Sequence, residues 1–238
     1  MHQIEVDGFT VDVVRKDIKH LHLAVYPPNG RIRVAVPLRV DDDAVRLAVI
    51  SRLGWIKRQQ AKFATQERQT AREYVSGESH YFQGARYRLN VIPQPGAGRV
   101  EIRNKAFLDL YVHPDSTPEQ RERVMSTWYR TFLRESIPTL IEKWQIVLSV
   151  QVSEWGIRQM KTRWGTCNIE AARIWINLEL AKKSPQCLEY IMVHELTHLL
   201  ERHHNDHFRA LMDRYYPQWQ AVRDVLNHEP LAHEDWEY

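Results

Sequence analysis

The chain carries, from Val193 to Phe208, the sequence VHELTHLLERHHNDHF. Two of its histidines, His194 and His198, stand four positions apart in a segment whose apolar residues recur with a period of about 3.6, which predicts a helix. Residues i and i+4 of a helix lie one turn apart on the same side, so both imidazoles can converge on one metal ion. Glu195 can then reach a water held by that ion and take its proton as the water attacks a carbonyl. This HExxH pattern therefore predicts a zinc site with Glu195 as general base.

A zinc site of this kind needs a third protein ligand, and the spacing supplies His204 as the candidate. His204 follows His198 by six positions, as in the extended pattern HExxHxxGxxH, although Glu201 occupies the glycine position. An unbroken helix would carry His204 sideways and too far along its axis to share the ion. The helix is therefore expected to break between Glu201 and His204. Asn205 is a good N-cap for a new helix beginning at Asp206, which leaves His204 in the connecting turn.

Other acidic and imidazole groups compete for the third position. Glu229 or Glu234, near the end of the sequence, is the main alternative ligand. His203 precedes the candidate ligand, so its side chain is expected to point elsewhere. His207 is expected to be a solvated or hydrogen-bonded side chain in the first turn of the next helix. The contrasting interpretation of the whole segment is a stripe of surface histidines that bind no metal.

Outside this segment the residue pattern predicts an α+β protein. Alternation of apolar and polar residues predicts strands over 4–14, 20–26, 31–36, 81–93, 100–112, 148–154, 159–164 and 173–178, with a turn at or beside residues 164–168. Helices are expected over 41–72, from 117 to a stop before Pro138 with a short piece to 144, and from 184 to 200. No internal repeat is evident. We predict two domains, an N-terminal strand, helix and strand region over 1–115 and a C-terminal region over 116–238 that contains the metal site.

Composition narrows the class of protein. The 238 residues are 43% hydrophobic and 26% charged, which is ordinary for a soluble globular protein. No apolar run is long enough for a membrane helix, and residues 1–8 lack the apolar core of a signal peptide. Two cysteines cannot form a disulfide framework, so a cytoplasmic location is expected. The net charge of +3 comes from scattered basic residues, which leaves nucleic-acid binding possible but unsupported.

Several short motifs occur in an order and spacing that resemble a known family. They are RWGTC at 163–167, INL at 176–178, VHELTHL at 193–199, HNDHF at 204–208 and YPQW at 216–219. Together they resemble the YgjP-like zinc metallopeptidases, relatives of the SprT-like and WLM families. A looser similarity continues into the strand at 31–37, the pair Trp55-Ile56 and the segment FQGARY at 82–87. The resemblance thus covers nearly the whole chain.

The resemblance implies a zincin-like fold, with the active-site helix packed on a small sheet and a β-rich N-terminal region. It implies zinc on His194, His198 and His204, Glu195 as catalytic base, and a peptide or protein as substrate. The family pattern has no glycine at the position of Glu201. The resemblance implies no particular substrate, and no oligomeric state follows from the sequence.

Substrate contacts are expected from residues near the predicted sheet edge. Because zincins bind peptides in extended form along an edge strand, Arg163, Trp164 and Gly165 are candidates to line the cleft. Tyr216, or its neighbour Tyr215, could donate a hydrogen bond to the oxyanion, although core packing explains either residue as well. Peptide-bond hydrolysis is the function predicted. The alternatives are a non-catalytic, zinc-stabilised binding module and a latent peptidase whose N-terminal segment covers the cleft.

Overall fold

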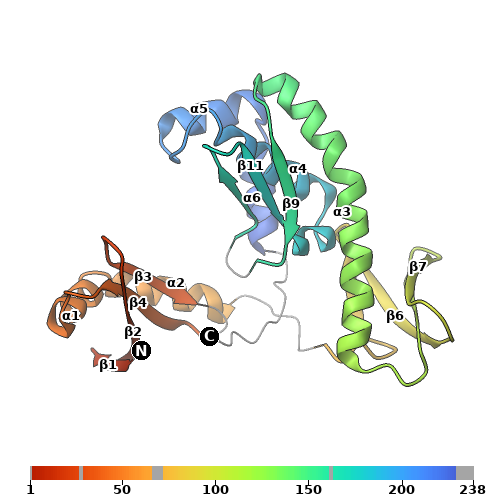
Figure 1. Cartoon of the computed structure of the whole chain (residues 1–238), viewed down its shortest axis with the longest axis horizontal. Helices are drawn as coiled ribbons and strands as arrows, with labels where there is room; N and C mark the ends of the chain where they lie inside the picture. Colours follow the sequence, from red (N-terminus) through yellow and green to blue (C-terminus); the bar gives the residue numbers. More distant parts are fainter. Residues whose placement is uncertain (1, 27–28, 66–71, 161–162, 229–238) are drawn as a thin grey trace. The chain divides into compact units, whose positions relative to one another are not determined.

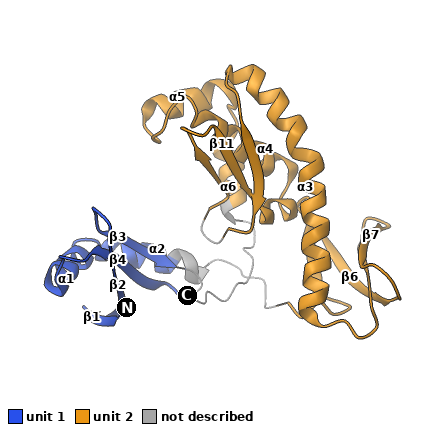
Figure 2. Ribbon diagram, in the orientation of Figure 1, with its two compact units in different colours: residues 1–70, 230–238 blue, residues 71–229 orange. Residues whose placement is uncertain are grey.

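The computed structural model describes residues 2–26, 29–65, 72–160 and 163–228. Within them the chain forms two compact units, one ending at residue 65 and one spanning 72–228 (Figure 2). Each unit has its own buried apolar core. Both contain helices and strands (Figure 1), which confirms the α+β class predicted from the sequence.

The first unit is a four-stranded sheet followed by two helices. Its strands lie in the order β1-β2-β4-β3, where β1 is His2–Val6, β2 is Phe9–Lys16, β3 is His22–Tyr26 and β4 is Arg31–Pro37. The helices are α1 (Asp42–Ile50) and α2 (Leu53–Thr65). The single strand predicted over 4–14 is wrong, because Asp7 and Gly8 adopt left-handed φ angles of 51° and 79° and reverse the chain into a hairpin.

The helix predicted over 41–72 is interrupted after its first turns. The Ser51 hydroxyl donates to the Ala48 carbonyl oxygen at 2.9 Å, and the Arg52 N–H bonds back only three residues, to Val49. These local bonds replace the helical pattern between α1 and α2. The last part of the predicted helix, residues 66–71, lies outside the described residues.

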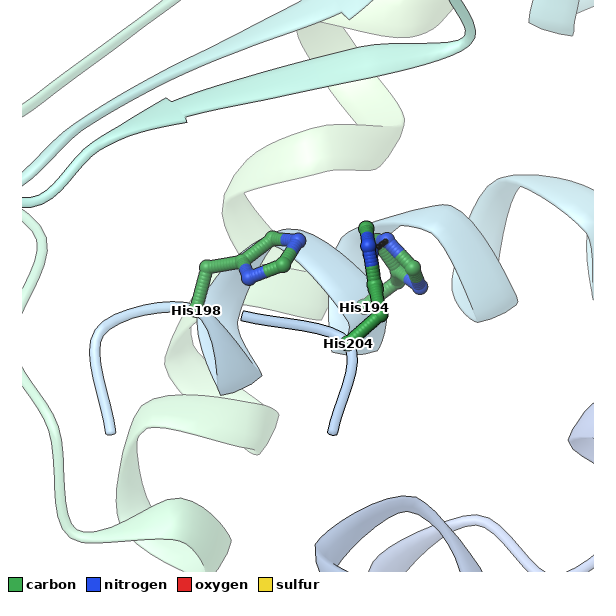
Figure 3. A group of neighbouring side chains, drawn as sticks. All are labelled: His194, His198 and His204. Carbon is green, nitrogen blue, oxygen red and sulfur yellow. Dashed lines mark hydrogen bonds between the residues drawn. The ribbon is translucent and has the colours of Figure 1, made fainter. Parts of the chain in front are cut away.

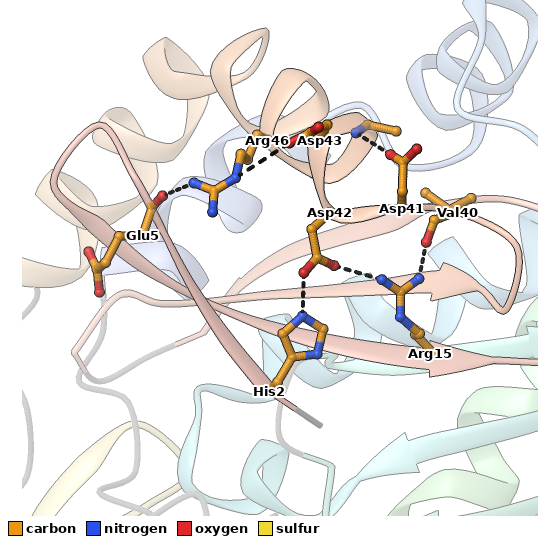
Figure 4. Close-up of polar contacts among 9 residues, drawn as sticks. His2, Glu5, Arg15, Val40, Asp41, Asp42, Asp43 and Arg46 are labelled. Atoms are coloured by element: carbon orange, nitrogen blue, oxygen red, sulfur yellow. Dashed lines mark hydrogen bonds and ion pairs between the residues drawn. The ribbon is translucent and has the colours of Figure 1, made fainter.

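Polar contacts tie the start of α1 to the sheet of the same unit (Figure 4). Asp41 caps the helix by accepting from the Ala44 N–H at 2.8 Å. The next carboxylate, Asp42, accepts from Arg15 at 2.6 Å and lies 2.9 Å from the His2 ring. The aspartates that predicted a helix start therefore also fix where the helix sits on β1 and β2.

The second unit begins with a sheet of the same topology. Its strands lie in the order β5-β6-β8-β7, where β5 is Ser79–Phe82, β6 is Ala85–Pro93, β7 is Arg99–Arg103 and β8 is Phe107–Val112. In both sheets two antiparallel hairpins are joined by a parallel pairing, β2 with β4 and β6 with β8. The first hairpin of each turns on a left-handed pair, Asp7-Gly8 or Gln83-Gly84. The structure thus contains a repeat of strand topology that the sequence did not reveal.

Helix α3 (Pro118–Leu148) is longer than predicted. It begins as expected, with Thr117 and Gln120 forming a capping box. The predicted stop before Pro138 is wrong, because the helix continues through this proline to Ser149, whose φ is 54°. An internal proline costs about 3 kcal/mol. The buried stripe of large apolar residues on both sides of it, Leu133, Ile137, Ile141, Trp144 and Leu148, outweighs that cost.

The long helix connects the first sheet of this unit to the C-terminal elements (Figure 1). A second sheet has the order β10-β11-β9, where β9 is Glu154–Arg158, β10 is Gly165–Asn168 and β11 is Arg173–Asn177. A 3-10 helix η1 (Leu178–Lys182) and three α-helices follow, α4 (Pro185–Thr197), α5 (Asp206–Tyr215) and α6 (Trp219–His228). Helix α4 packs on β10 and β11, as the sequence analysis expected of the helix that carries the histidines.

Two predicted strands of this region are wrong. Residues 148–153 do not form a strand, because α3 extends to Leu148 and β9 begins at Glu154. Of the strand predicted over 159–164, residues 161–162 lie outside the described part and the others are in no strand. One edge strand of this sheet is β10, where a turn was expected.

The compact units differ from the predicted division at residue 115. One apolar core joins Leu89 and Leu108 of the first sheet to Leu133 of α3 and Met192 of α4. The strands between 79 and 112 therefore pack with the C-terminal half of the chain. Where a functional domain begins stays a prediction. No helix in the described ranges is long and apolar enough to cross a membrane.

Candidate metal centre and substrate cleft

Helix α4 carries His194 and Glu195 in a largely buried segment, and His198 follows at its C-terminal end. The helix starts at Pro185, at the first helical position, and its side chains are almost all buried in the core of the second unit. Met192, Val193 and Leu196 have no exposed surface. His194 and His198 are half-buried on the side that faces a cavity. Polar groups in such a setting require partners.

The helix that carries the histidines ends at Thr197, a few residues earlier than the predicted break between Glu201 and His204. Helix α5 begins at Asp206 with the Asn205 side chain accepting from the Phe208 N–H at 2.9 Å. His204 therefore lies in the turn between the two helices and folds back over α4 (Figure 3). The predicted helix break before Asn205 is confirmed.

The turn brings three imidazoles together (Figure 3). One ring nitrogen each of His194, His198 and His204 lies within 4.8 Å of the others. The Nε2 atoms of His194 and His204 are 3.0 Å apart. In contrast, His203 and His207 are not part of this group, as expected, and Glu229 and Glu234 lie outside the described residues.

The state of these rings suits a divalent cation. Burial, and then the neighbouring His198 and His204, lower the pKa of His194 to about 3, so its ring is the neutral form that binds metal. Its Nδ1 is buried and has no partner among the described residues. Nδ1 of His198 lies 3.1 Å from the Glu201 carbonyl oxygen. A hydrogen bond there places the proton on Nδ1 and leaves Nε2 free as a ligand.

Glu201, which stands at the glycine position of the extended pattern, organises the turn with its side chain. One carboxylate oxygen accepts from the His203 N–H at 3.0 Å, and the other lies 3.3 Å from Nδ1 of His207. These bonds, the backbone bond first, lower the pKa of Glu201. The carboxylate thereby closes the loop that carries His204. The sequence analysis missed this role, although the unexpected residue at that position was a signal.

Glu195 lies beside the histidines and is 5% exposed. Burial raises its pKa to about 8, and the positive charge of Arg163 opposes the rise. The carboxylate packs against the backbone of Gly165 in β10. A Cβ atom at Gly165 would stand 2.6 Å from Oε1 of Glu195 and 2.7 Å from its Cγ. Gly165 therefore provides the space in which the carboxylate sits.

A cavity of about 1110 Å³ opens over these groups. Its walls are β10 with the residues before it, α4, the turn after α4, and α6. Three of the predicted contact residues, Arg163, Trp164 and Gly165, line it. Tyr216 is not among the lining residues, because its ring is 3% exposed and packs against Trp144 and Tyr190 in the core.

The structure adds lining residues that the sequence analysis missed. Arg202 lies in the turn after α4, Arg223 lies on α6, and Tyr190 lies one helical turn before His194. The sequence offered a signal for Tyr190, because it stands four positions before His194 and so shares its side of the helix. No local pattern marked Arg223, because it reaches the cavity only through the packing of α6.

Comparison with known proteins gives the family. The model described as "YgjP-like, metallopeptidase domain" matches residues 19–229. The chain belongs to the YgjP-like metallopeptidase family. Membership implies a divalent metal and protein or peptide substrates, and the described part of this YgjP-like chain contains a group of three histidines with ring nitrogens within 4.8 Å of one another.

Two solved structures share part of its length. The metallopeptidase zymogen of Pyrococcus abyssi abylysin is 20% identical, with a TM-score of 0.36 over 38% of this chain and 90% of its own. The metallopeptidase zymogen of Methanocaldococcus jannaschii jannalysin is 19% identical, with a TM-score of 0.34 over 38% of this chain and 92% of its own. No curated protein matches the YgjP-like chain.

Proposed function

We propose that the protein hydrolyses peptide bonds with a zinc ion held by His194, His198 and His204 and with Glu195 as general base. The observation that supports this most directly is the convergence of three ring nitrogens within 4.8 Å, next to a buried carboxylate, in the wall of a cavity. Three imidazoles with an open fourth position are a donor set typical of catalytic zinc.

Zinc, when bound, supplies a lowered pKa for a coordinated water and polarises the substrate carbonyl. The remaining work belongs to side chains of the protein. Glu195 accepts a proton from the attacking water and returns it to the leaving amine. Gly165 leaves room for this carboxylate next to β10, and the core around α4 holds the helix that carries it.

The substrate backbone has a docking edge in β10. This strand pairs with β11 on one side, and no strand in the described part of the chain pairs with its other side. Gly165 to Asn168 also line the cavity. An extended peptide can hydrogen-bond to such an edge, which would bring its carbonyl groups close to Glu195.

Replacing Glu195 by glutamine tests the proposal. Wild-type protein and the Glu195→Gln variant should both contain about one zinc per chain, and only the wild type should cleave substrates in a casein-type screen. Metal analysis, cleavage and thermal melting with and without chelator are measured together. A fully active Glu195→Gln variant would overturn the mechanism. Strong destabilisation by chelator without cleavage of any substrate would instead indicate a zinc-stabilised binding module.

A further inference from the structure

The walls of the cavity carry an excess of positive charge. Three arginines line it, and the acidic residues in the wall are Glu170 and the buried Glu195. The arginines come from three separate places, with Arg163 before β10, Arg202 in the turn after α4 and Arg223 on α6. All three are exposed. They therefore present charge to a ligand from more than one side of the cavity.

Among the described residues, these arginines have few carboxylate partners. Arg163 and Arg202 form no ion pair with any carboxylate in the ranges that the structure describes. Arg223 lies 3.2 Å from the carboxylate of its neighbour Asp224, and both side chains are about half exposed. An exposed pair of this kind contributes little and separates easily. The guanidinium group of Arg223 also lies 5.1 Å from the centre of the Trp219 ring, which limits its mobility.

The segment that carries Arg163 is held in place by a buried amide. The side chain of Asn177 donates to the carbonyl oxygens of Met160 and Arg163, at 2.7 and 2.8 Å. Its backbone N–H donates to the Trp164 carbonyl oxygen at 2.9 Å. Asn177 is 4% exposed. Arg163 therefore projects from a fixed backbone just before β10, in the wall of the cavity.

The wall also contains apolar side chains. Trp164, Ile191, Leu199 and Leu226 contribute to it together with the ring of Tyr190. Such a surface accommodates the backbone and aliphatic parts of a peptide, and the arginines then differentiate among its charged side chains. A lysine-rich segment would meet like charge, which is unfavourable for association.

We propose that the cavity selects acidic peptides, with Arg163, Arg202 and Arg223 binding Asp or Glu side chains that flank the scissile bond. The position relative to the scissile bond rests on the proposed function, whereas the preference for acidic ligands rests on the charge of the wall alone. Guanidinium groups suit this task because they bind carboxylates in a bidentate manner.

Binding to the full-length Glu195→Gln protein tests the preference without relying on cleavage. Three fluorescent peptides of about ten residues share one apolar framework and differ at the same set of positions. The acidic peptide carries Asp and Glu there, the neutral peptide Asn and Gln, and the third peptide Lys. Their dissociation constants are measured by fluorescence anisotropy. The acidic peptide should bind about tenfold tighter than the lysine peptide, and this ratio should shrink as salt rises from about 50 to about 500 mM.

Single and double arginine variants then assign the effect. In the same Glu195→Gln background, Arg202→Gln should weaken binding of the acidic peptide by about threefold, and Arg163→Gln with Arg202→Gln by about tenfold. The neutral peptide should be affected much less. Arg134→Gln is the matched control, because Arg134 is exposed on α3 and does not line the cavity. It should bind all three peptides as its parent does.

The outcomes separate the two proposals. Equal affinity for the three peptides, or an equal loss for acidic and neutral peptides in the arginine variants, would overturn the acidic preference even if the wild type cleaves peptides. A clear acidic preference in a protein whose wild type cleaves none of the peptides would support the preference and count against the proposed hydrolysis.

Discussion

A single methyl group added at Gly165 should displace the Glu195 side chain that packs directly against it. The built Cβ of Gly165→Ala would lie 2.6 Å from Oε1, 2.7 Å from Cγ and 2.9 Å from Cδ of Glu195. Ordinary contact begins at 3.4 Å, so the carboxylate must move by about 0.8 Å. Because Glu195 is 5% exposed and two of the close atoms are carbons of its side chain, a small rotation at the tip of the chain cannot relieve the contact.

This displacement is large compared with the tolerance of a catalytic site. A misplacement of about 1 Å can reduce a rate about 100-fold, which corresponds to about 2.7 kcal/mol in the activation barrier. We therefore expect Gly165→Ala to lower kcat/KM by one to two orders of magnitude, about 10- to 100-fold. The three atoms nearest the new methyl group all belong to Glu195 and none to the three histidines. The zinc content should therefore remain that of the wild type.

The assay compares kcat/KM on one peptide cleaved by the wild type, zinc content and thermal melting. Gly54→Ala is the matched control, because a Cβ there meets one atom of the Arg58 side chain at the ordinary distance of 3.6 Å. It should keep full activity. A Gly165→Ala variant with wild-type melting, normal zinc and activity within about twofold of wild type would refute the packing argument.

Two further predictions concern the turn after α4 and the buried His80. Glu201→Ala removes the acceptor for the His203 N–H and the partner of His207, so zinc affinity in a chelator competition should fall about 10- to 100-fold. Glu201→Gln keeps one acceptor oxygen, so its zinc affinity should fall less. Equal zinc affinity in both variants and the wild type would contradict the proposed role of Glu201 in the turn. Burial, followed by the charges of Arg72 and Lys182, lowers the pKa of His80 to about 3. The unfolded chain takes up this proton near pH 6.5, so stability should fall as the pH drops from about 6.5 towards 3. As the pH falls from 7 to 4.5, the free energy of unfolding measured with urea should decrease by roughly 2 kcal/mol less for His80→Gln than for the wild type. An equal decrease in both proteins would refute this prediction.

The sequence predicted the site where local geometry determines it. The spacing of His194 and His198 is sufficient because a helix fixes which residues share a side. The break before His204 follows from the same geometry, since a continuous helix could not bring that ring to the others. Asn205 supplies the chemistry for a new helix start, and the structure uses it in that way. Each of these inferences depends on residues close together in the sequence.

Predictions failed where packing overrides a local preference. Pro138 disfavours a helix, but the buried stripe that includes Ile137 and Ile141 keeps α3 continuous. The topology shared by the two four-stranded sheets also escaped detection. Such a sheet requires alternating residues and a left-handed turn pair, which Asp7-Gly8 and Gln83-Gly84 satisfy with different side chains. Similar topology therefore needs no recognisable similarity of sequence.

Gly165 shows most clearly what one sequence cannot distinguish. A glycine near Asn168 favours a turn when only neighbouring residues are considered. In the structure this glycine belongs to β10 and pairs with Ile176 of β11. Its φ is not left-handed, so backbone freedom is not the reason for a glycine here. The reason is the Glu195 carboxylate, which occupies the place of a side chain. A glycine required by a distant residue has the same letter as one required by a turn, and only the packing of α4 on β10 separates the two explanations.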